Sequence, residues 1–401
     1  MSSEDRAPAY SWYALALLTT VYVFNFLDRT LIYILFQPIK KEMALTDLQL
    51  ALLGTTSFVI FYTLLGVPAG MLADRTSRKT IIGIGLAIWS LFSGLTGFAH
   101  GFWELFACRV MVGVGEATLG PAALSLLADY FPARMRATAQ SVYASGIAIG
   151  GGLAFFLGGW IGQSYGWRWA FYLLGFPGLV LAVLVFFLRE KSAERLVQSN
   201  VRPDAGVLFR SKRYLYLCAG YAMLGLASNS LGIWGPAFFV RVHKFSLLTV
   251  GTAAGIISIV IGAPAMILSG VISDRVRRRT LFTSIVALLS IPLWIALLFV
   301  DNVVLLVVTN VVLYALAIMW VGPATADVTE IAGPGLRGLA IGVFFSTVNI
   351  AAYGIGSPLI GKLSDLSTLR LALLTCPTAC AAGAILLTLS WFSGVTPGKS
   401  T

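Results

Sequence analysis

Apolar segments long enough to cross a lipid bilayer follow one another along the whole chain. A helix rises about 1.5 Å per residue, so about 20 apolar residues span the hydrocarbon core. Twelve such segments occur, at residues 11–36, 48–73, 79–98, 101–128, 137–163, 168–188, 214–240, 247–272, 280–300, 303–327, 338–363 and 369–393. Hydrophobic residues make up 58% of the 401 residues and charged residues only 11%, which leaves too little polar surface for a water-soluble protein. The sequence therefore predicts an all-α polytopic membrane protein with 12 transmembrane helices.

Basic residues set the expected orientation of these helices. The formal net charge of +11 by itself also suits a nucleic-acid-binding protein. Here, however, most Lys and Arg residues lie in loops on one side of the predicted membrane, a pattern that keeps such loops cytoplasmic. We therefore expect both termini in the cytoplasm, no nucleic-acid partner, and a multi-pass integral protein of a bacterial inner membrane.

A short sequence recurs 200 residues further along the chain. Residues 69–80 read AGMLADRTSRKT and residues 269–280 read SGVISDRVRRRT. Each copy lies between the second and third apolar segments of its half of the chain. The one long polar stretch, residues 189–213, separates the halves. We therefore predict two pseudo-symmetric six-helix bundles, residues 1–188 and 214–401, joined by a cytoplasmic linker.

The repeated loop carries charges that can hold the two bundles together on the cytoplasmic side. Gly70 leaves room for a neighbouring helix, and Asp74 can accept hydrogen bonds at the N-terminus of a helix in the opposite bundle. Arg78 and Lys79 can pair with acids at cytoplasmic helix ends, such as Asp129. The predicted cytoplasmic gate comprises Gly70, Asp74, Arg78, Lys79, Asp129, Asp274 and Arg278. The alternative is that these charges are only topology anchors, which do not require the aspartates.

Four ionisable residues lie at membrane depth, where charges are costly and usually line a cavity. Asp28 and Arg29 are in the first apolar segment, and Arg109 and Glu116 are in the fourth. Asp28 and Arg109 are each about 12 Å from the outer end of their segment, and Glu116 is about 10 Å deeper than Arg109. We therefore expect Arg109 to lie where it can pair with either carboxylate.

This arrangement suggests a proton switch. An unpaired carboxylate in a low-dielectric cavity takes up a proton readily. Protonation of Asp28 from the outside would then free Arg109 to move toward Glu116 or toward an anionic headgroup. The alternative is a static cluster of charges that only fixes how the helices pack.

The second half has no comparable charges in its apolar segments until Asp327 and Glu330, near a cytoplasmic end. Its polar candidates for a cavity wall are neutral. They are Asn229, Asn310, Tyr314, Asn349 and Tyr353. A cavity that is charged on one wall and mostly apolar on the other suits an amphipathic molecule, although each of these residues can instead serve as a polar contact between helices.

Several motifs resemble those of a known family. Residues 25–30 read NFLDRT, residues 37–53 read QPIKKEMALTDLQLALL, residues 109–117 read RVMVGVGEA and residues 128–131 read ADYF. They resemble the spinster-like branch of the major facilitator superfamily. The repeated loop resembles the signature loop of that superfamily, with Ser77 and Arg277 in place of its second glycine.

The resemblance implies the major facilitator fold and a proton-coupled secondary active transporter that works by alternating access. It implies amphipathic lipids, such as lysophospholipids or sphingosine-phosphate-like molecules, as substrates. It also implies that Asp28, Arg29, Arg109 and Glu116 form the proton-coupling and headgroup site.

Two other functions stay open at this point. The organic anion symporters of the same superfamily share the Asn-x-x-Asp-Arg and G-x-G-E-A motifs, and only residues 37–53 favour the spinster-like branch. A receptor or scaffold that does not transport is the alternative from another class. We expect no enzyme, because His100 and His243 show no catalytic or metal-binding spacing. We expect no cofactor and no metal site, and a monomer whose partners are the bilayer, protons and its substrate.

Overall fold

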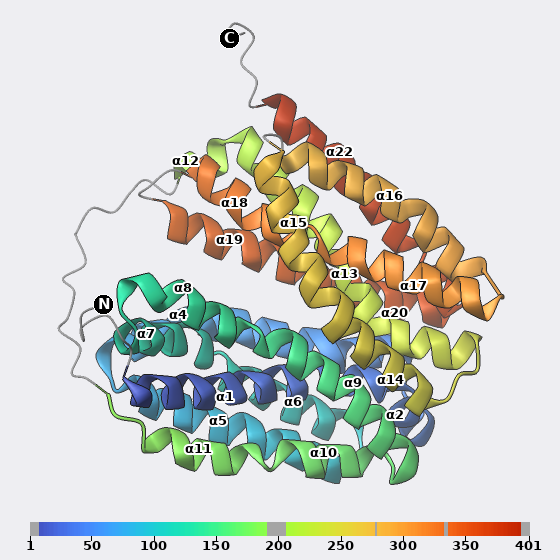
Figure 1. The fold of residues 1–401 in the computed structure, drawn as a ribbon. Coiled ribbons are helices and arrows are strands. Elements are labelled where there is room, and N and C mark those ends of the chain that lie inside the picture. The colour runs from blue at the N-terminus through green and yellow to red at the C-terminus, as the bar shows by residue number, and fades with distance from the viewer. Residues whose placement is uncertain (1–7, 191–205, 277–278, 333–335, 394–401) are drawn as a thin grey trace, which may run out of the picture. The chain divides into compact units, whose positions relative to one another are not determined.

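The computed structural model describes residues 8–190, 206–276, 279–332 and 336–393. Every regular element within these ranges is a helix (Figure 1), so the predicted all-α architecture is confirmed. The described residues fall into two compact units. The first unit lies within residues 1–197 and 239–259, and the second within residues 198–238 and 260–401.

The helices of the first unit follow the predicted apolar segments. They are α1 (Ala9–Ile34), α2 (Phe36–Met43), α3 (Asp47–Ala51), α4 (Ser57–Arg75), α5 (Arg78–Leu95), α6 (Phe102–Glu116), α7 (Leu119–Tyr130), α8 (Ala133–Ala144), α9 (Gly146–Ser164), α10 (Trp167–Gly175), α11 (Gly178–Phe186) and α14 (Leu247–Ile256). A π-helical turn, η2 (Leu52–Thr56), joins α3 to α4, and a 3₁₀ turn, η3 (Thr96–Phe98), follows α5. Helix α1 packs against α9, and α5 packs against α6 and α11.

The second unit is also built from long apolar helices. They are α12 (Gly206–Arg210), α13 (Lys212–Val242), α15 (Ala263–Arg275), α16 (Arg279–Phe299), α17 (Val303–Ile318), α18 (Val321–Ala332), α19 (Arg337–Asn349), α20 (Ser357–Leu366), α21 (Leu369–Ala372) and α22 (Thr375–Ser393). Two π-helical turns interrupt the α-helical pattern, η4 (Ile257–Gly262) and η5 (Ile350–Gly356). The last residues of α13 belong to the first unit, together with α14. The predicted division at residues 189–213 stays a prediction.

Eleven helical segments of the described chain are long and apolar enough to cross a membrane, judged by length and composition. The fourth predicted span, residues 101–128, is instead two shorter helices, α6 and α7. They meet at Ala117 and Thr118, where the Thr118 hydroxyl donates a 2.9 Å hydrogen bond to the main-chain oxygen of Gly115. Glu116 therefore ends α6 inside the first unit.

Close approach of two backbones positions this helix end. A Cβ atom on Gly115 would lie 2.6 Å from the main-chain oxygen of Gly85 and 2.8 Å from the main-chain nitrogen of Trp89. Neither contact is sterically possible without a backbone shift. Small residues at a helix crossing allow this proximity in membrane proteins, where van der Waals packing drives association. Gly85 and Gly115 thus allow α6 to lie directly against α5.

Gly115→Ala tests this packing. We expect the added methyl group to force the two helices apart and to lower the free energy of unfolding by about 1–3 kcal/mol. Thermal unfolding of the purified protein in detergent measures the effect. Gly120→Ala is the matched control, because a Cβ atom there meets nothing within 4 Å. Equal melting temperatures for the two variants would contradict the packing argument.

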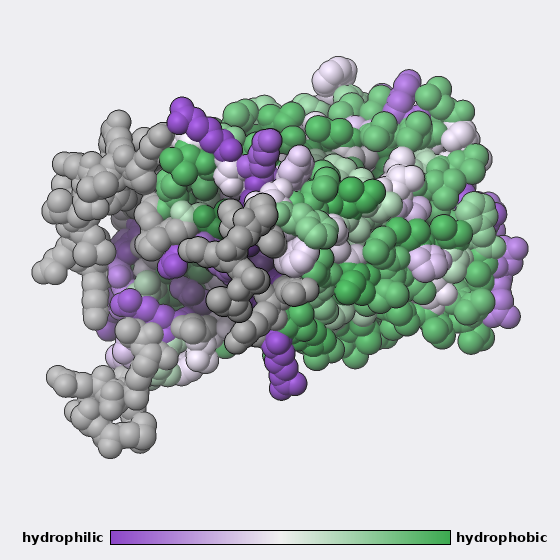
Figure 2. All heavy atoms as spheres, turned by 90° about the horizontal axis from the view of Figure 1, so that it is seen from above, coloured by the Kyte–Doolittle hydropathy of each residue, from purple (hydrophilic) through white to green (hydrophobic). Residues whose placement is uncertain are grey.

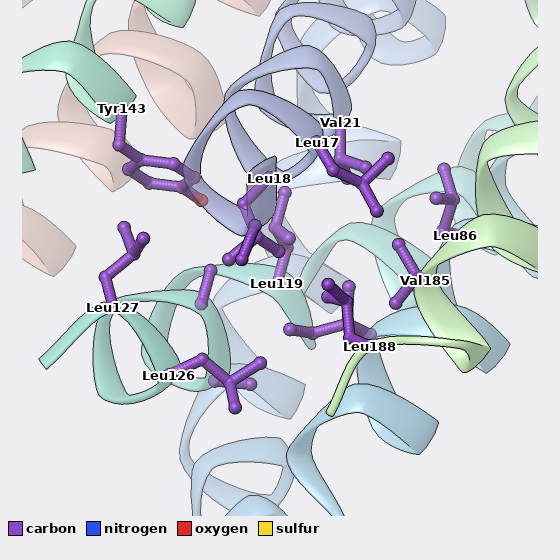
Figure 3. Close-up of a cluster of buried hydrophobic side chains, with 14 of the residues drawn as sticks. Leu17, Leu18, Val21, Leu86, Leu119, Leu126, Leu127, Tyr143, Val185 and Leu188 are labelled. Atoms are coloured by element: carbon purple, nitrogen blue, oxygen red, sulfur yellow. The ribbon is translucent and has the colours of Figure 1, made fainter. Parts of the chain in front are cut away.

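Aliphatic side chains fill the middle of the first unit. Figure 3 shows a buried cluster contributed mainly by α1, α5, α7, α8 and α11. Its labelled members are Leu17, Leu18, Val21, Leu86, Leu119, Leu126, Leu127, Tyr143, Val185 and Leu188. This apolar packing joins these helices into one core.

The surface is largely apolar, as expected of a protein in contact with lipid tails. On the face seen in Figure 2, apolar residues cover most of the surface and hydrophilic residues gather toward its two ends. We call the end of the first unit near Arg78 its inner end and the end near Lys40 its outer end. Exposed aromatic side chains lie near both, Trp12 and Tyr13 near the inner end and Trp103, Trp160, Tyr165 and Trp169 near the outer end. Such aromatic belts mark the two membrane interfaces.

Candidate functional site

Arg29 and Glu116 form an ion pair inside the first unit. The guanidinium of Arg29 donates from Nη2 (2.7 Å) and Nε (3.1 Å) to Oε2 of Glu116. The Glu116 side chain is fully buried and that of Arg29 is 18% exposed. The sequence analysis expected Arg109 to lie within reach of either Asp28 or Glu116; in the structure, Arg29 is the residue that pairs with Glu116.

Three aromatic rings surround the Arg29 guanidinium. Its central carbon lies 4.4 Å from the ring centroid of Phe58, 4.8 Å from that of Phe26 and 5.0 Å from that of Tyr62. A cation over an aromatic face is attracted by the ring quadrupole, and more strongly where water is scarce. Arg29 is therefore a charged group held in place by both an acid and an aromatic surround.

Asp28 and Arg109 are both fully buried. Ser93 on α5 donates a 2.7 Å hydrogen bond to Oδ1 of Asp28, and Arg109 donates from Nη1 to the main-chain oxygen of Asp28 at 3.3 Å. The carboxylate of Asp28 and the guanidinium of Arg109 thus do not form the ion pair expected from their depth. Ser93 holds the carboxylate instead.

Several polar atoms of this pair are left without partners. Among the described residues, Oδ2 of Asp28 and Nε and Nη2 of Arg109 are buried without a hydrogen bond. A buried charge without a full set of partners is costly and persists where function requires it. We call Asp28, Arg29, Arg109 and Glu116 the buried charge cluster.

Helix periodicity explains how α6 contributes to this cluster. Leu105, Arg109, Val112 and Glu116 are all buried, and their spacing of three or four residues places them on one face. Helix α4 also comes close to α6, because a Cβ atom on Gly113 would lie 2.9 Å from the main-chain oxygen of Phe58. The glycines of residues 112–115, which read VGVG, therefore allow α4 and α5 to pack closely against α6. The face of α6 that carries Arg109 and Glu116 is buried in the first unit.

A second network of charges lies at the inner end of the first unit. Nη2 of Arg78 is 2.6 Å from a carboxylate oxygen of Asp129, so the structure brings together two residues of the predicted gate. Arg78 also donates from Nε to Glu190 (2.9 Å) and from Nη1 to the Ser125 hydroxyl (2.8 Å). The Ser77 hydroxyl donates to Glu190 at 2.6 Å. All these residues belong to the first unit, and whether they act as a gate stays a proposal.

Glu190 was missed by sequence reasoning, although it follows directly on a predicted span. Burial by itself raises the pKa of Glu190, but hydrogen bonds from Ser77 and from the side chain and main chain of Arg78 outweigh burial. The pKa of Glu190 therefore lies below its usual value. Such a shift means that the ionised form stabilises the fold.

Glu190→Gln tests this contribution. The ionised carboxylate stabilises the fold at pH values above the unfolded pKa of about 4.3, and this stabilisation is lost as the pH falls through the lower folded pKa. We expect the variant to lose about 1–3 kcal/mol of stability at neutral pH and progressively less below about pH 4. Melting curves over a range of pH measure it.

Glu330→Gln is the matched control for that experiment. Glu330 is 62% exposed and pairs with Arg279 at 3.0 Å, and exposed ion pairs contribute at most about 1 kcal/mol. If Glu190→Gln costs no more than the control at neutral pH, the network is not a stabilising one.

The remaining gate residues cannot be placed in this network. The structure describes only the backbone at Gly70, Asp74 and Asp274. Arg278 lies outside the described residues. Lys79 is half-buried in the first turn of α5.

A third network, at the outer end of the first unit, was also missed. Asp47 is 2% exposed and accepts hydrogen bonds from both Nη1 (2.5 Å) and Nη2 (2.6 Å) of Arg241, and from Lys40 (2.5 Å). Thr46 and Gln49 cap the start of α3 with reciprocal hydrogen bonds, which holds Asp47 in the first turn. The sequence TDLQ carries this capping signal, but nothing local to it indicates Arg241.

Of the predicted neutral wall in the second unit, the structure brings two residues together. Tyr353 in η5 donates a 2.5 Å hydrogen bond to Oδ1 of Asn229, whose amide donates to the main-chain oxygen of Gly225 on α13. Asn310 and Tyr314 lie half-buried on α17, and Asn349 ends α19. Their role in a cavity stays a prediction.

A bundle of apolar helices with ionic groups buried at membrane depth is the architecture of a multi-pass membrane transporter. The chain matches the model of the Major Facilitator Superfamily over residues 18–352. It therefore belongs to this superfamily of membrane transporters.

Individual relatives refine the comparison. The chain is 28% identical over 372 residues to an MFS-type efflux pump of Mycolicibacterium smegmatis. The aligned region covers 90% of this chain and 86% of that protein. It is 31% identical over 250 residues to protein spinster homolog 1 of Homo sapiens, covering 59% of this chain but only 47% of that protein. The fold matches that of a bacterial homologue of the human lysosomal transporter Spinster, solved in an inward-facing and occupied conformation. That match has a TM-score of 0.88 and 24% identity, and it covers 98% of this chain and 100% of the other.

Proposed function

We propose that this protein is a proton-coupled secondary transporter of amphipathic lipids with an anionic headgroup, such as lysophospholipids or sphingosine-phosphate-like molecules. The observation that carries the proposal is the buried charge cluster, which places two acids and two arginines among the apolar helices of the first unit. The likeness to spinster homolog 1 supports this choice of substrate class.

Asp28 is the proposed proton-binding residue. It is fully buried, it accepts one neutral hydrogen bond from Ser93, and its second oxygen has no partner among the described residues. A carboxyl group in such surroundings gains from taking up a proton, because the neutral form needs no compensating charge. Arg109, which bonds only to the main chain of Asp28 among the described residues, responds to that change of charge.

Arg29 is the proposed headgroup contact. It is the most exposed member of the cluster, and it pairs with Oε2 of the fully buried Glu116. A phosphate can offer two oxygens to a guanidinium at once, and can therefore compete with Glu116 for Arg29. The aromatic rings around Arg29 offer an apolar surface beside the charge, as an amphipathic molecule requires.

Reconstituted liposomes test the proposal. We expect saturable movement of a lysophospholipid that accelerates when a pH gradient is imposed. Gradient-dependent movement of a small organic anion alone would favour the symporter branch instead. If neither compound moves, the protein is a receptor or scaffold.

Topology and assembly belong to the same proposal. The loop charges support cytoplasmic termini in a bacterial inner membrane. Both bundles lie on one chain, which supports a monomer as the transporting unit.

A further inference from the structure

Asp327 is a buried acid in the second unit that the proposed function does not use. It lies on α18 and is only 8% exposed. The hydroxyl of Tyr221 on α13 donates a 2.8 Å hydrogen bond to its Oδ2 atom. Tyr221 is fully buried, in edge-on contact with Phe344 at 5.8 Å and tilted against Trp320 at 6.0 Å. The acid and the phenol thus form a polar pair inside a packed apolar core.

A chain of hydroxyl groups leads from this acid into the bundle. The Tyr221 oxygen lies 3.4 Å from Oγ1 of Thr283 on α16, and the Thr283 hydroxyl also donates a 3.1 Å hydrogen bond to the main-chain oxygen of Arg279. Thr283 in turn lines a cavity of about 20 Å³, together with Ser228, Ser290 and Trp320. That volume holds about one water molecule, and the hydroxyls of the lining are suitable partners for it. Two hydroxyl groups therefore connect the carboxylate with a water-sized space.

Among the described residues, the charges around Asp327 do not pair with it directly. Arg279 on α16 pairs through Nη1 with Glu330, 3.0 Å away on α18 itself, and the charges of Arg279 and, more weakly, of Arg213 on α13 both act on Asp327. Within the described residues, no Lys or Arg nitrogen lies within 4.0 Å of this carboxylate.

The other helices packed against α18 add no closer charge among the described side chains. Helix α19 contributes the apolar Ala340 and Phe344 to the same core. Helix α15 approaches α18 through Ser269 and Gly270 at Gly322, and its last residue, Arg275, is exposed. Tyr221 is therefore the group that meets the carboxylate directly.

We propose that Asp327 is a second proton-binding site, located in the second unit and loaded through Thr283 and Tyr221. A proton from solvent reaches a water molecule in the cavity and passes to Thr283, while Thr283 gives its own proton to Tyr221 and Tyr221 gives its own to Asp327. The water and both hydroxyls end unchanged, and the carboxylate becomes a carboxylic acid. The inference rests on the proposed proton coupling and extends it, because each half of the chain then carries a titrating acid.

Infrared difference spectroscopy of the purified full-length protein, without substrate, tests the site directly. We expect the difference between about pH 5 and about pH 8 to contain a carboxylic-acid carbonyl band that Asp327→Asn removes. Tyr221→Phe should shift the band, because the phenol hydrogen bond to that group is lost. Asp28→Asn is the control that removes a different buried acid and leaves this band in place.

Each outcome decides the proposal. An unchanged spectrum in Asp327→Asn overturns it. The amide oxygen of Asn still accepts the hydrogen bond of Tyr221, so the variant retains the packing contact. If it nevertheless fails to fold, an unshifted band in Tyr221→Phe overturns the proposal on its own.

A transport arm separates this inference from the proposed function. In liposomes, Asp327→Asn should reduce the protons moved per substrate molecule about twofold, while substrate continues to move. If the infrared band is present but a pH gradient does not drive transport in the unmodified protein, proton coupling fails and the proton site at Asp327 stands. If the gradient drives transport but the band is absent, proton coupling stands and the proton site at Asp327 fails.

Discussion

We expect Asp28→Asn to abolish pH-gradient-driven transport and to leave the folded protein intact. The amide is nearly isosteric with the carboxyl group and still accepts the 2.7 Å hydrogen bond from Ser93, but it does not titrate near neutral pH. Because Asp28 is fully buried, its charge state changes the field at Arg109 with little screening by solvent. We expect the gradient-driven rate in liposomes to fall to that of protein-free vesicles.

Two further measurements make this expectation decisive. Asp301→Asn is the matched control, since Asp301 is 89% exposed and its replacement should leave the rate unchanged. Size-exclusion chromatography and melting curves establish that the variant is folded. If Asp28→Asn retains full coupling, Asp28 is not the proton site and the buried charge cluster is only a packing element.

Asp47→Ala opens the outer end of the first unit. The substitution leaves Arg241 and Lys40 without the carboxylate that binds both, and breaking a buried ion pair costs about 3 kcal/mol. Arg241 belongs to the segment 239–259, which packs on the first unit. If this segment separates from α9, the lost ion pairs shift the equilibrium toward the separated state about 100-fold.

Thiol labelling measures this shift. Val250 on α14 is 4% exposed, so a cysteine placed there is protected while the segment is packed. In a background without the four native cysteines, we expect Asp47→Ala to raise its labelling rate by at least about tenfold.

Glu42→Ala is the control at the same end. Glu42 pairs with Arg168 and accepts a 2.6 Å hydrogen bond from Trp167, all of them outside the segment 239–259. This variant should leave labelling unchanged. Equal rates for Asp47→Ala and the unmodified protein would show that the Asp47 network does not hold the outer end closed.

Glycine contacts explain why this segment packs so closely. A Cβ atom on Gly251 would lie 2.4 Å from the main-chain oxygen of Phe155, and one on Gly159 would lie 3.0 Å from the Cα atom of Gly251. Helices α9 and α14 therefore approach each other through their backbones, as small residues at a helix interface allow.

The identity of the charged residues at membrane depth followed from the sequence, but their pairing did not. Asp28 and Arg109 were placed at the same depth, yet Arg29 and not Arg109 pairs with an acid. The depth of a residue in the membrane depends only on the rise per residue along its helix. Which residues pair depends also on the direction in which each side chain points from the helix axis. Adjacent residues such as Asp28 and Arg29 point about 100° apart around a helix, so which of them meets α6 depends on how α1 is rotated against its neighbours.

Charges in short loops and at helix ends were harder still to interpret. Asp47 has a local signal in its capping box, but Arg241 is 194 residues away. Glu190 and Asp327 are both visible as acids beside or inside an apolar segment. What makes them notable is the contact with Ser77 and Arg78 in one case and Tyr221 in the other, and no sequence spacing encodes those contacts.

The sequence alone therefore determined the class of protein: a polytopic helical membrane protein with a repeated inner loop and four ionisable groups at membrane depth. These properties are local, because the length of an apolar run and the cost of a buried charge do not depend on what packs beside them. The tertiary structure decided which acid meets which base, where α6 ends, and that Asp327 is enclosed. Those outcomes depend on the rotation and close approach of helices, which glycine contacts such as Gly85 with Gly115 permit and which no single segment specifies.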